Sequence, residues 1–147
     1  MKVVLQRVLN ASVHVDNKEV GIIAAGLVVL LGIKEGDNLA IIEKVVQKII
    51  QMRIFNDADG KMNRSLEDIN GQLLIISQFT LYANSLKGNR PSFIEAARPE
   101  LAIPLYEQFI QSAKNRIGDS QVATGIFGAD MQVSLVNDGP VTIVMEY

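Results

Sequence analysis

The sequence has no cysteine and only one histidine among its 147 residues. Without cysteine the chain cannot form disulfides, use a thiol nucleophile or bind zinc through thiolates. Its longest apolar run, residues 22–33, contains Gly26 and Gly32 and is shorter than the ~20 apolar residues that a membrane span needs. Near the N-terminus, Gln6 and Arg7 interrupt the apolar residues before the core of a signal peptide is reached. We therefore expect a cytoplasmic protein that does not cross a membrane.

A surplus of basic residues is also absent. The chain has 14 Lys and Arg against 16 Asp and Glu, which gives a net charge of −2. Proteins that neutralise many phosphates usually carry a basic surplus, so this balance argues against extensive wrapping of nucleic acid. A short RNA end could still bind a local patch, and the best candidate is residues 84–98. This stretch contains Lys87, Arg90 and Arg98 against Glu95. A solvated loop with ordinary surface charges explains the same residues equally well.

The length and the apolar content of 48% fit one domain that spans residues 1–147. Apolar periodicity predicts strands at residues 3–15, 18–25, 27–33 and 72–82, and two or three further strands around Val122, at 131–136 and at 141–146. A first helix is expected at residues 39–52, with Asp37 or Asn38 as its N-cap. Residues 55–64 read as a loop. This order predicts an α/β fold of mixed β layers, with two β layers and two main helices packed on one side, in a three-layer β/β/α arrangement.

The second helix is expected from Pro99, because proline suits the first turn of a helix. Its predicted buried face consists of Leu105, Phe109, Ala113 and Ile117. Pro104 leaves two alternatives. Either the helix starts late, or Pro104 lies within its first turn.

The single histidine restricts the chemistry that side chains can perform. Ser-His-Asp and Cys-His mechanisms place an imidazole beside the nucleophile. His14 lies next to Ser12 on the polar face of an N-terminal strand, which favours a structural role. A zinc site with one histidine and no cysteine would need carboxylates for its remaining ligands, which is rare. We expect no metal, no cofactor and no conventional general base.

Two further groups of residues have ordinary structural explanations. Asp57, Asp59, Glu67 and Asp68 surround Gly60 but lack the spacing of a calcium-binding loop, which favours a solvated loop. Residues 124–128 (Thr-Gly-Ile-Phe-Gly) lack both the third glycine of a dinucleotide fingerprint and the Lys-Ser/Thr of a P-loop. Glycines that turn one strand into the next explain that segment better.

Residues 77–81 (Ser-Gln-Phe-Thr-Leu) place polar groups at the end of an apolar strand, where they commonly line a site. Ser77 and Thr80 offer hydroxyls and Gln78 offers an amide. The local backbone N–H groups could form an oxyanion hole. The alternative is a strand that simply emerges into solvent.

Residues 137–142 (Asn-Asp-Gly-Pro-Val-Thr) place a proline within a β segment. Proline cannot donate to a ladder, so Pro140 belongs at an edge, a bulge or a tight turn. The Gly139–Pro140 bond can be cis or trans. The alternative is a hairpin turn between two late strands.

Together, residues 77–81 and 137–142 resemble the signature pair of the D-aminoacyl-tRNA deacylases, also called D-tyrosyl-tRNA(Tyr) deacylases. Further segments fit the same family: residues 6–8 (Gln-Arg-Val), 11–13 (Ala-Ser-Val), 30–32 (Leu-Leu-Gly), 53–55 (Arg-Ile-Phe), 60–63 (Gly-Lys-Met-Asn), 90–93 (Arg-Pro-Ser-Phe) and 131–133 (Met-Gln-Val). The resemblance covers essentially the whole chain.

The resemblance implies an editing enzyme that hydrolyses the ester of D-aminoacyl-tRNA. Ser77, Gln78, Phe79 and Thr80 would line the pocket for the aminoacylated 3′ adenosine. Phe79 and Thr80 would stabilise the ester oxyanion through backbone N–H groups. The RNA's own 2′-hydroxyl would assist, which agrees with the lack of a side-chain base. A Thr80 nucleophile ranks second, because no base activates its hydroxyl.

The resemblance also implies a homodimer. Gly139 and Pro140, joined by a cis bond, would enter the partner's site, hold the substrate amino group through their carbonyls and exclude L side chains sterically. Glycine, which has no side chain to clash, would then be accepted as well as D-amino acids. Arg7 and Met131 would support the Gly-Pro loop.

Two rival functions remain. The first is a non-catalytic nucleotide- or nucleic-acid-binding module on the same fold, which would not hydrolyse aminoacyl-tRNA. The second is a relative in which the Gly139–Pro140 bond is trans, which would open the pocket to some L-amino acids. Release of D- versus L-tyrosine from charged tRNA distinguishes these functions.

Overall fold

One long strand, β1, organises the computed structural model of the chain, which describes residues 1–86 and 88–147. The strands are β1 (Lys2–Val15), β2 (Lys18–Ile23), β3 (Gly26–Gly32), β4 (Phe55–Asn56), β5 (Met62–Arg64), β6 (Gln72–Ser77), β7 (Val122–Thr124) and β8 (Gln132–Glu146). The first half of β1 pairs with β3 and the second half with β2, and β8 runs antiparallel to β1 along its whole length. Strands β3, β6 and β7 are parallel to one another. The result is a six-stranded mixed sheet, with β4 and β5 as a separate hairpin inside the expected loop.

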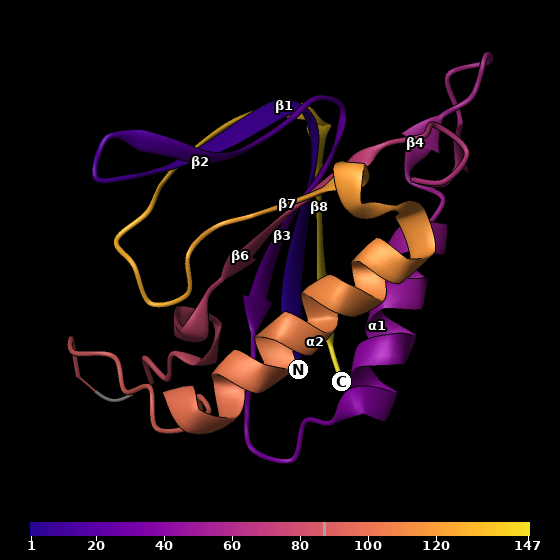
Figure 1. Cartoon of the computed structure of the whole chain (residues 1–147). Coiled ribbons are helices and arrows are strands. Elements are labelled where there is room, and N and C mark those ends of the chain that lie inside the picture. Colours follow the sequence, from indigo (N-terminus) through magenta and orange to yellow (C-terminus); the bar gives the residue numbers. More distant parts are fainter. Residues whose placement is uncertain (87) are drawn as a thin grey trace.

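The sheet is covered on both faces, which gives the expected β/β/α layers. Helices α1 (Leu39–Gln51) and α2 (Pro99–Ile117) pack side by side on one face (Figure 1). On the other face, the β1–β2 hairpin bends over β6 and β7. Adjacent residues of β6 point into different apolar clusters: Ile75 packs in the cluster that contains Phe109 of α2, and Leu74 in the cluster that contains Val13 of β1. This alternation fits a strand buried on both faces.

The helices begin where the sequence predicts. Asn38 is the N-cap of α1, and its side-chain oxygen accepts a hydrogen bond from the N–H of Ile41 at 3.2 Å. Helix α2 starts at Pro99 and continues through Pro104, which lies beyond the first turn. Both alternatives for Pro104 were therefore wrong, because the packing of α2 outweighs the loss of one backbone donor. Among the described residues, no helix is both long enough and apolar enough to cross a membrane.

Most predicted strands differ from the structure by one or two residues at an end, and two differences are larger. The strand expected at residues 72–82 ends at Ser77, and a short 3₁₀ helix, η1 (Phe79–Tyr82), follows it. The two late strands expected at 131–136 and 141–146 are one strand, β8. The Gly139–Pro140 bond is cis and lies in an irregularity of β8, not in a hairpin turn. This agrees with the rule that a strand proline sits at an edge or a bulge.

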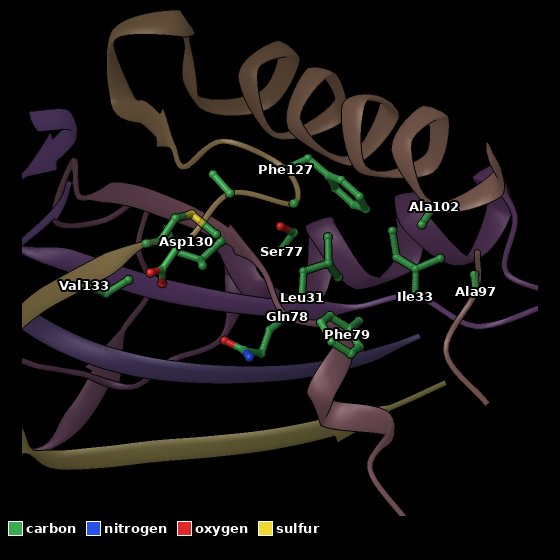
Figure 2. Close-up of a pocket in the computed structure, with 14 residues that line it drawn as sticks. Leu31, Ile33, Ser77, Gln78, Phe79, Ala97, Ala102, Phe127, Asp130 and Val133 are labelled. Carbon is green, nitrogen blue, oxygen red and sulfur yellow. The ribbon is translucent and has the colours of Figure 1, made fainter. Parts of the chain in front are cut away.

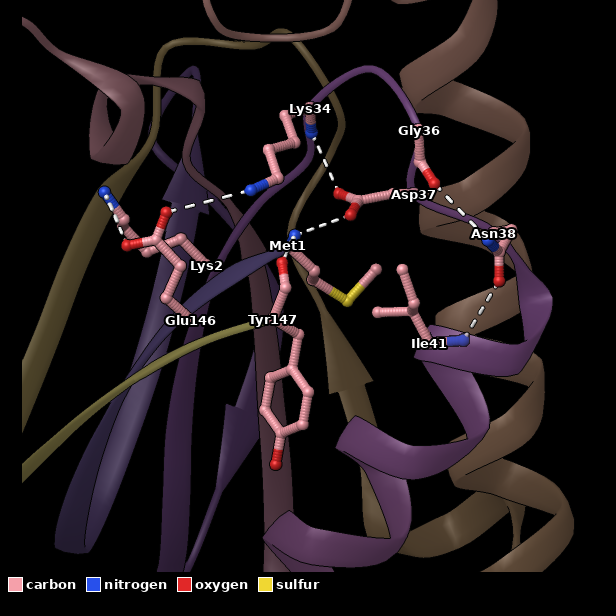
Figure 3. Close-up of polar contacts among 9 residues, drawn as sticks. All are labelled: Met1, Lys2, Lys34, Gly36, Asp37, Asn38, Ile41, Glu146 and Tyr147. Atoms are coloured by element: carbon pink, nitrogen blue, oxygen red, sulfur yellow. Dashed lines mark hydrogen bonds and ion pairs between the residues drawn. The ribbon is translucent and has the colours of Figure 1, made fainter.

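The N-terminal amine of Met1 is buried at the junction of β1, β8 and α1 (Figure 3). It donates to the carboxylate of Asp37 at 2.5 Å and to the carbonyl of Tyr147 at 2.9 Å. The other Asp37 oxygen accepts the N–H of Lys34 at 2.9 Å. Asp37, predicted as a possible N-cap, therefore fastens the loop before α1 to the start of β1.

Asp37→Asn is expected to lower the free energy of unfolding by about 3 kcal/mol, because it leaves a buried ammonium group without its counter-charge. Urea denaturation measures the change. Glu35→Gln is the matched control, since Glu35 is exposed on the same loop and should shift stability by less than about 0.5 kcal/mol. Equal stability of the two variants would show that the Asp37 ion pair is not a significant support of the fold.

Candidate active site

A cavity of about 290 Å³ opens where β3 and β6 end (Figure 2). These strands are parallel, and Leu31 pairs with Ser77 at their carboxyl ends. Ligand sites of open α/β sheets commonly form at this edge, because loops that leave parallel strands converge there. The start of α2 and the loop between β7 and β8 close the remaining sides of the cavity.

The cavity has an apolar end and a polar end. Figure 2 shows Ile33, Ala97 and Ala102 at one end and Gln78 and Asp130 at the other. The wide apolar wall suits a flat ring system, and the polar end offers an amide and a carboxylate. The cavity can therefore bind a ligand with an aromatic part and a polar part.

The chain leaves β6 in a way that exposes backbone donors. The N–H of Gln78 donates to the carbonyl of Leu31 at 2.8 Å, which fixes the end of the strand. The next two N–H groups, those of Phe79 and Thr80, open η1 and donate to no acceptor in the described part of the chain. Adjacent free N–H groups at a cavity mouth can stabilise a developing negative charge.

The Thr80 hydroxyl is not arranged as an activated nucleophile. The Gln78 side-chain amide donates a hydrogen bond to Thr80 Oγ1. An amide donor cannot remove a proton, and the residues that line the cavity include no histidine or lysine. His14 lies elsewhere, paired with Glu19 of β2 and Gln132 of β8.

An aromatic pair supports the wall formed by Phe127. Its ring lies 5.6 Å from that of Tyr106 on α2, measured between centroids. The Tyr106 hydroxyl donates to the carbonyl of Ile75 at 2.9 Å. Burial raises the pKa of Tyr106, so this phenol remains a neutral donor at any physiological pH. Helix, sheet and cavity loop are thereby held together.

Part of the loop after β7 could not be assigned to the site from the sequence. Residues 124–128 were interpreted as a turn and Met131 was predicted only as a support of the Gly-Pro loop, whereas residues 127–131 line the cavity. Gly125 makes this possible, because a Cβ there would lie 2.4 Å from the sulfur of Met131 and would displace that side chain from the cavity wall. The available signal was an aromatic residue between glycines directly after an apolar strand.

Gly139 and Pro140 form a separate cluster with Arg7. Gln6 pairs with Thr142 and Val8 with Asn137, so residues 138–141 stand opposite Arg7 alone. The buried Arg7 guanidinium donates to the carbonyl of Asp138 at 3.0 Å and to that of Ile54 at 2.6 Å. It also pairs with the Asp138 carboxylate at 3.1 Å.

The Asn137 side chain closes this bulge and ties it to β1. Its oxygen accepts the N–H of Val141 at 3.1 Å, and its amide donates to the side chain of Gln6. Gly139 and Pro140 are exposed. They are not among the residues that line the cavity of their own chain.

The predicted site residues thus fall into two groups. Ser77, Gln78, Phe79 and Met131 line the cavity, whereas Thr80, the next residue of η1, is not among the lining residues. Arg7, Gly139 and Pro140 lie together on the β1–β8 ladder. The part of the chain that the structure describes holds no cluster of three or more His, Asp or Glu side chains placed to bind a metal.

Known proteins resemble this chain along its whole length. Residues 4–146 match the family described as D-Tyr-tRNA(Tyr) deacylase. Proteins named D-aminoacyl-tRNA deacylase are 60% identical in Cytophaga hutchinsonii and 53% identical in Flavobacterium psychrophilum; each alignment covers 99% of this chain and 97% of the relative.

Two solved structures share the fold. One, the "c-Myc DNA Unwinding Element Binding Protein", is 41% identical with a TM-score of 0.95, over 100% of this chain and 99% of that one. The other, a probable eukaryotic D-amino acid tRNA deacylase, is 18% identical with a TM-score of 0.82, over 98% and 97% of the two chains. At that identity the second likeness concerns the fold alone. With the full-length family match and relatives above 50% identity, the chain belongs to the D-Tyr-tRNA(Tyr) deacylase family.

Proposed function

We propose that this protein is an editing hydrolase that cleaves the ester bond between tRNA and a wrongly attached D-amino acid. The observation that carries the proposal is a cavity that is bordered by free backbone donors and lined by no histidine or lysine, in a chain 60% identical to a protein named D-aminoacyl-tRNA deacylase. Charged tRNA is made and used in the cytoplasm, so we place the protein there.

The terminal adenosine of the tRNA occupies the cavity. Its base lies against the apolar wall that includes Phe127, and Ser77 and Gln78 provide polar contacts. The ester then lies at the cavity mouth, within reach of the free N–H groups of Phe79 and Thr80. No cofactor or metal takes part in this arrangement.

Hydrolysis relies on the substrate's own chemistry. The N–H groups of Phe79 and Thr80 stabilise the oxyanion that forms when water attacks the ester carbonyl. The 2′-hydroxyl of the terminal ribose assists the attack, because the residues that line the cavity include no histidine or lysine. The Thr80 side chain accepts a hydrogen bond from Gln78 and holds that amide in place.

The active form is a homodimer in which the exposed Gly139–Pro140 segment enters the partner's cavity. The free edge of β8 and the exposed apolar side chains of Val136 and Val144 on that strand suit contact with a second copy. Arg7 supports the segment from below. Met131 lines the cavity, so in the dimer it contacts the Gly-Pro segment of the partner and not that of its own chain.

Chiral selection follows from this arrangement. The carbonyls of Gly139 and Pro140 hold the substrate amino group, and the N–H groups of Phe79 and Thr80 hold the ester. An L side chain then points into the Gly-Pro backbone, whereas a D side chain points outward. Selection acts by clash with the L form and needs little contact with the D form.

A second candidate function is a nucleic-acid-binding module without hydrolysis. It is favoured by the 41% identical structure whose title describes a DNA-element-binding protein. The net charge of −2 suits only limited contact with nucleic acid. Failure of the pure protein to release any amino acid from tRNA, together with measurable binding of nucleic acid, would favour this function.

The mechanism predicts that Thr80→Ala retains activity within about threefold, as does the control His14→Ala, since neither side chain performs the chemistry. Replacing the 2′-hydroxyl of the terminal adenosine with hydrogen should slow hydrolysis at least about 100-fold. Single-turnover rates with saturating enzyme measure both effects. A Thr80→Ala protein that binds normally but reacts about a thousandfold more slowly would establish Thr80 as the nucleophile.

Steric rejection predicts a pattern among substrates. D-Tyr-, D-Asp- and Gly-tRNA should be deacylated at similar rates, and L-Ala-tRNA at least about 100-fold more slowly, when compared side by side at limiting enzyme. Glycine has no Cβ to clash with Gly139 and Pro140, so it is the decisive substrate. If Gly-tRNA is spared while D-aminoacyl-tRNA is cleaved, the D side chain is recognised directly and exclusion by clash is wrong.

A further inference from the structure

The segment between η1 and α2 projects past the ends of β3 and β6 (Figure 1) and is anchored at its base. The backbones of Asn84 and Ser92 exchange hydrogen bonds of 2.7 and 2.9 Å. The N–H of Ala97 donates to the carbonyl of Ile33 at 2.9 Å. These bonds hold the described part of the segment, residues 84–86 and 88–98, near the cavity that Ala97 lines. Lys87, one of its predicted basic residues, lies outside the described residues.

This segment presents apolar side chains to solvent. Leu86 is 91% exposed and Ile94 is 90% exposed. Next to them, the Phe93 ring packs edge-on against Phe79, with centroids 5.2 Å apart. Phe79 also lines the cavity, so Phe93 links this segment to the cavity rim. Side chains exposed to this extent contribute almost nothing to the folded core.

A second hollow has a volume of about 280 Å³. It is lined by Lys2, Tyr82, Ala83, Asn84, Ser85, Leu86 and Glu95. The same two segments of the chain contribute to both hollows. In η1, Phe79 lines the first hollow and Tyr82 the second, and before α2, Ala97 lines the first and Glu95 the second. A chain that emerges from the first hollow along this rim therefore reaches the second.

The basic residues of this segment favour a phosphate backbone. Arg90 and Arg98 are exposed, and the ion pairs among the described residues involve neither of them. Glu95 is the acidic residue of the segment. Two exposed guanidinium groups on a segment that also lines a mixed apolar and polar hollow match the pattern of single-stranded nucleic-acid sites, in which bases stack on apolar groups and cations contact phosphates.

We propose that the hollow beside Leu86 is a second nucleotide subsite, which receives the nucleotides that precede the terminal adenosine of an RNA 3′ end. Leu86 and Ile94 contact the bases, and Arg90 and Arg98 contact the phosphates. The inference rests on the proposed function, because it continues the path of an RNA whose last nucleoside occupies the first cavity. It also explains how a chain with net negative charge engages RNA, through a local contact with a short end.

The test compares substrates of increasing length: D-tyrosyl-adenosine, the D-tyrosyl ester of the trinucleotide CCA, and D-Tyr-tRNA. The double variant Leu86→Ser/Ile94→Ser removes the apolar surface, and Arg90→Gln removes one cation. Lys48→Gln, an exposed charge change on α1, is the matched control. Binding of uncharged CCA and of adenosine monophosphate is measured in parallel, since it does not depend on catalysis.

We expect the double variant to lose roughly 5- to 100-fold in kcat/KM for the trinucleotide ester and for tRNA, with D-tyrosyl-adenosine unchanged. Arg90→Gln should weaken CCA binding and reduce the slope of log affinity against log salt by about 0.7. The control should behave as wild type. Undiminished reaction of all three substrates, or equal losses on all three, would overturn the subsite.

Two further outcomes distinguish failure of the second subsite from failure of the proposed hydrolase function. If the double variant sediments as a monomer where wild type is a dimer, the apolar surface is an interface with a second copy and the subsite is wrong. If the wild-type protein hydrolyses no ester but binds CCA more tightly than adenosine monophosphate, and loses that difference in the double variant, the subsite stands and the proposed hydrolase function fails.

Discussion

The pairing of β1 with β8 leaves one residue of β1, Arg7, opposite residues 138–141 of β8. The excess of residues on β8 forces that strand to bulge away from the sheet. Arg7 fills the space beneath, where its buried guanidinium satisfies the carbonyls of Asp138 and Ile54. An arginine at this depth needs such partners, because an unpaired buried charge is costly. The same side chain therefore fixes the bulge, the segment after α1 and the outward direction of Gly139 and Pro140.

The cavity depends on a different part of the fold, the carboxyl ends of β3 and β6. There the chain turns into η1 and presents backbone N–H groups, and the hydroxyl of Thr80 accepts a bond from Gln78. Ester hydrolysis without a catalytic side chain depends on how the substrate is positioned and on backbone dipoles that point at the reacting carbonyl. Rigid backbone elements supply both better than mobile side chains. The lack of cysteine and the remote position of His14 are consistent with such a site. Gly139 and Pro140 lie away from the cavity of their own chain, which is the arrangement that the proposed homodimer requires.

Patterns within short stretches of sequence predicted most of the helices and strands. The features that they did not predict depend on pairing between segments that are distant in the chain. Apolar runs indicated strands buried on both faces, and Asn38 gave the start of α1, because those signals act over a few residues. The continuity of β8 could not be predicted, since a Gly-Pro pair signals a turn unless a partner strand such as β1 holds both sides. The sequence likewise gave no sign that Asp37 pairs with the Met1 amine or that the loop at Phe127 lines the cavity. Those contacts join segments that are distant in the chain. The motif at residues 77–80 could be singled out because it lies at the end of a single strand, and the resemblance to the deacylase family gave it a role.

Mixed dimers test the central claim, that each site is built from two chains, most directly. Ser77→Phe fills the cavity, and Gly139→Ala adds a Cβ 2.9 Å from a methyl group of Val141, so each homodimer should be inactive. Subunit exchange would produce a heterodimer in which the intact cavity of one chain meets the intact Gly-Pro segment of the other. Deacylation of D-Tyr-tRNA by the exchanged mixture should then recover to about one quarter of the wild-type rate, since half of the dimers are mixed and each has one complete site. Heterodimers that form, as shown by mass, and remain as inactive as the two homodimers would contradict the account.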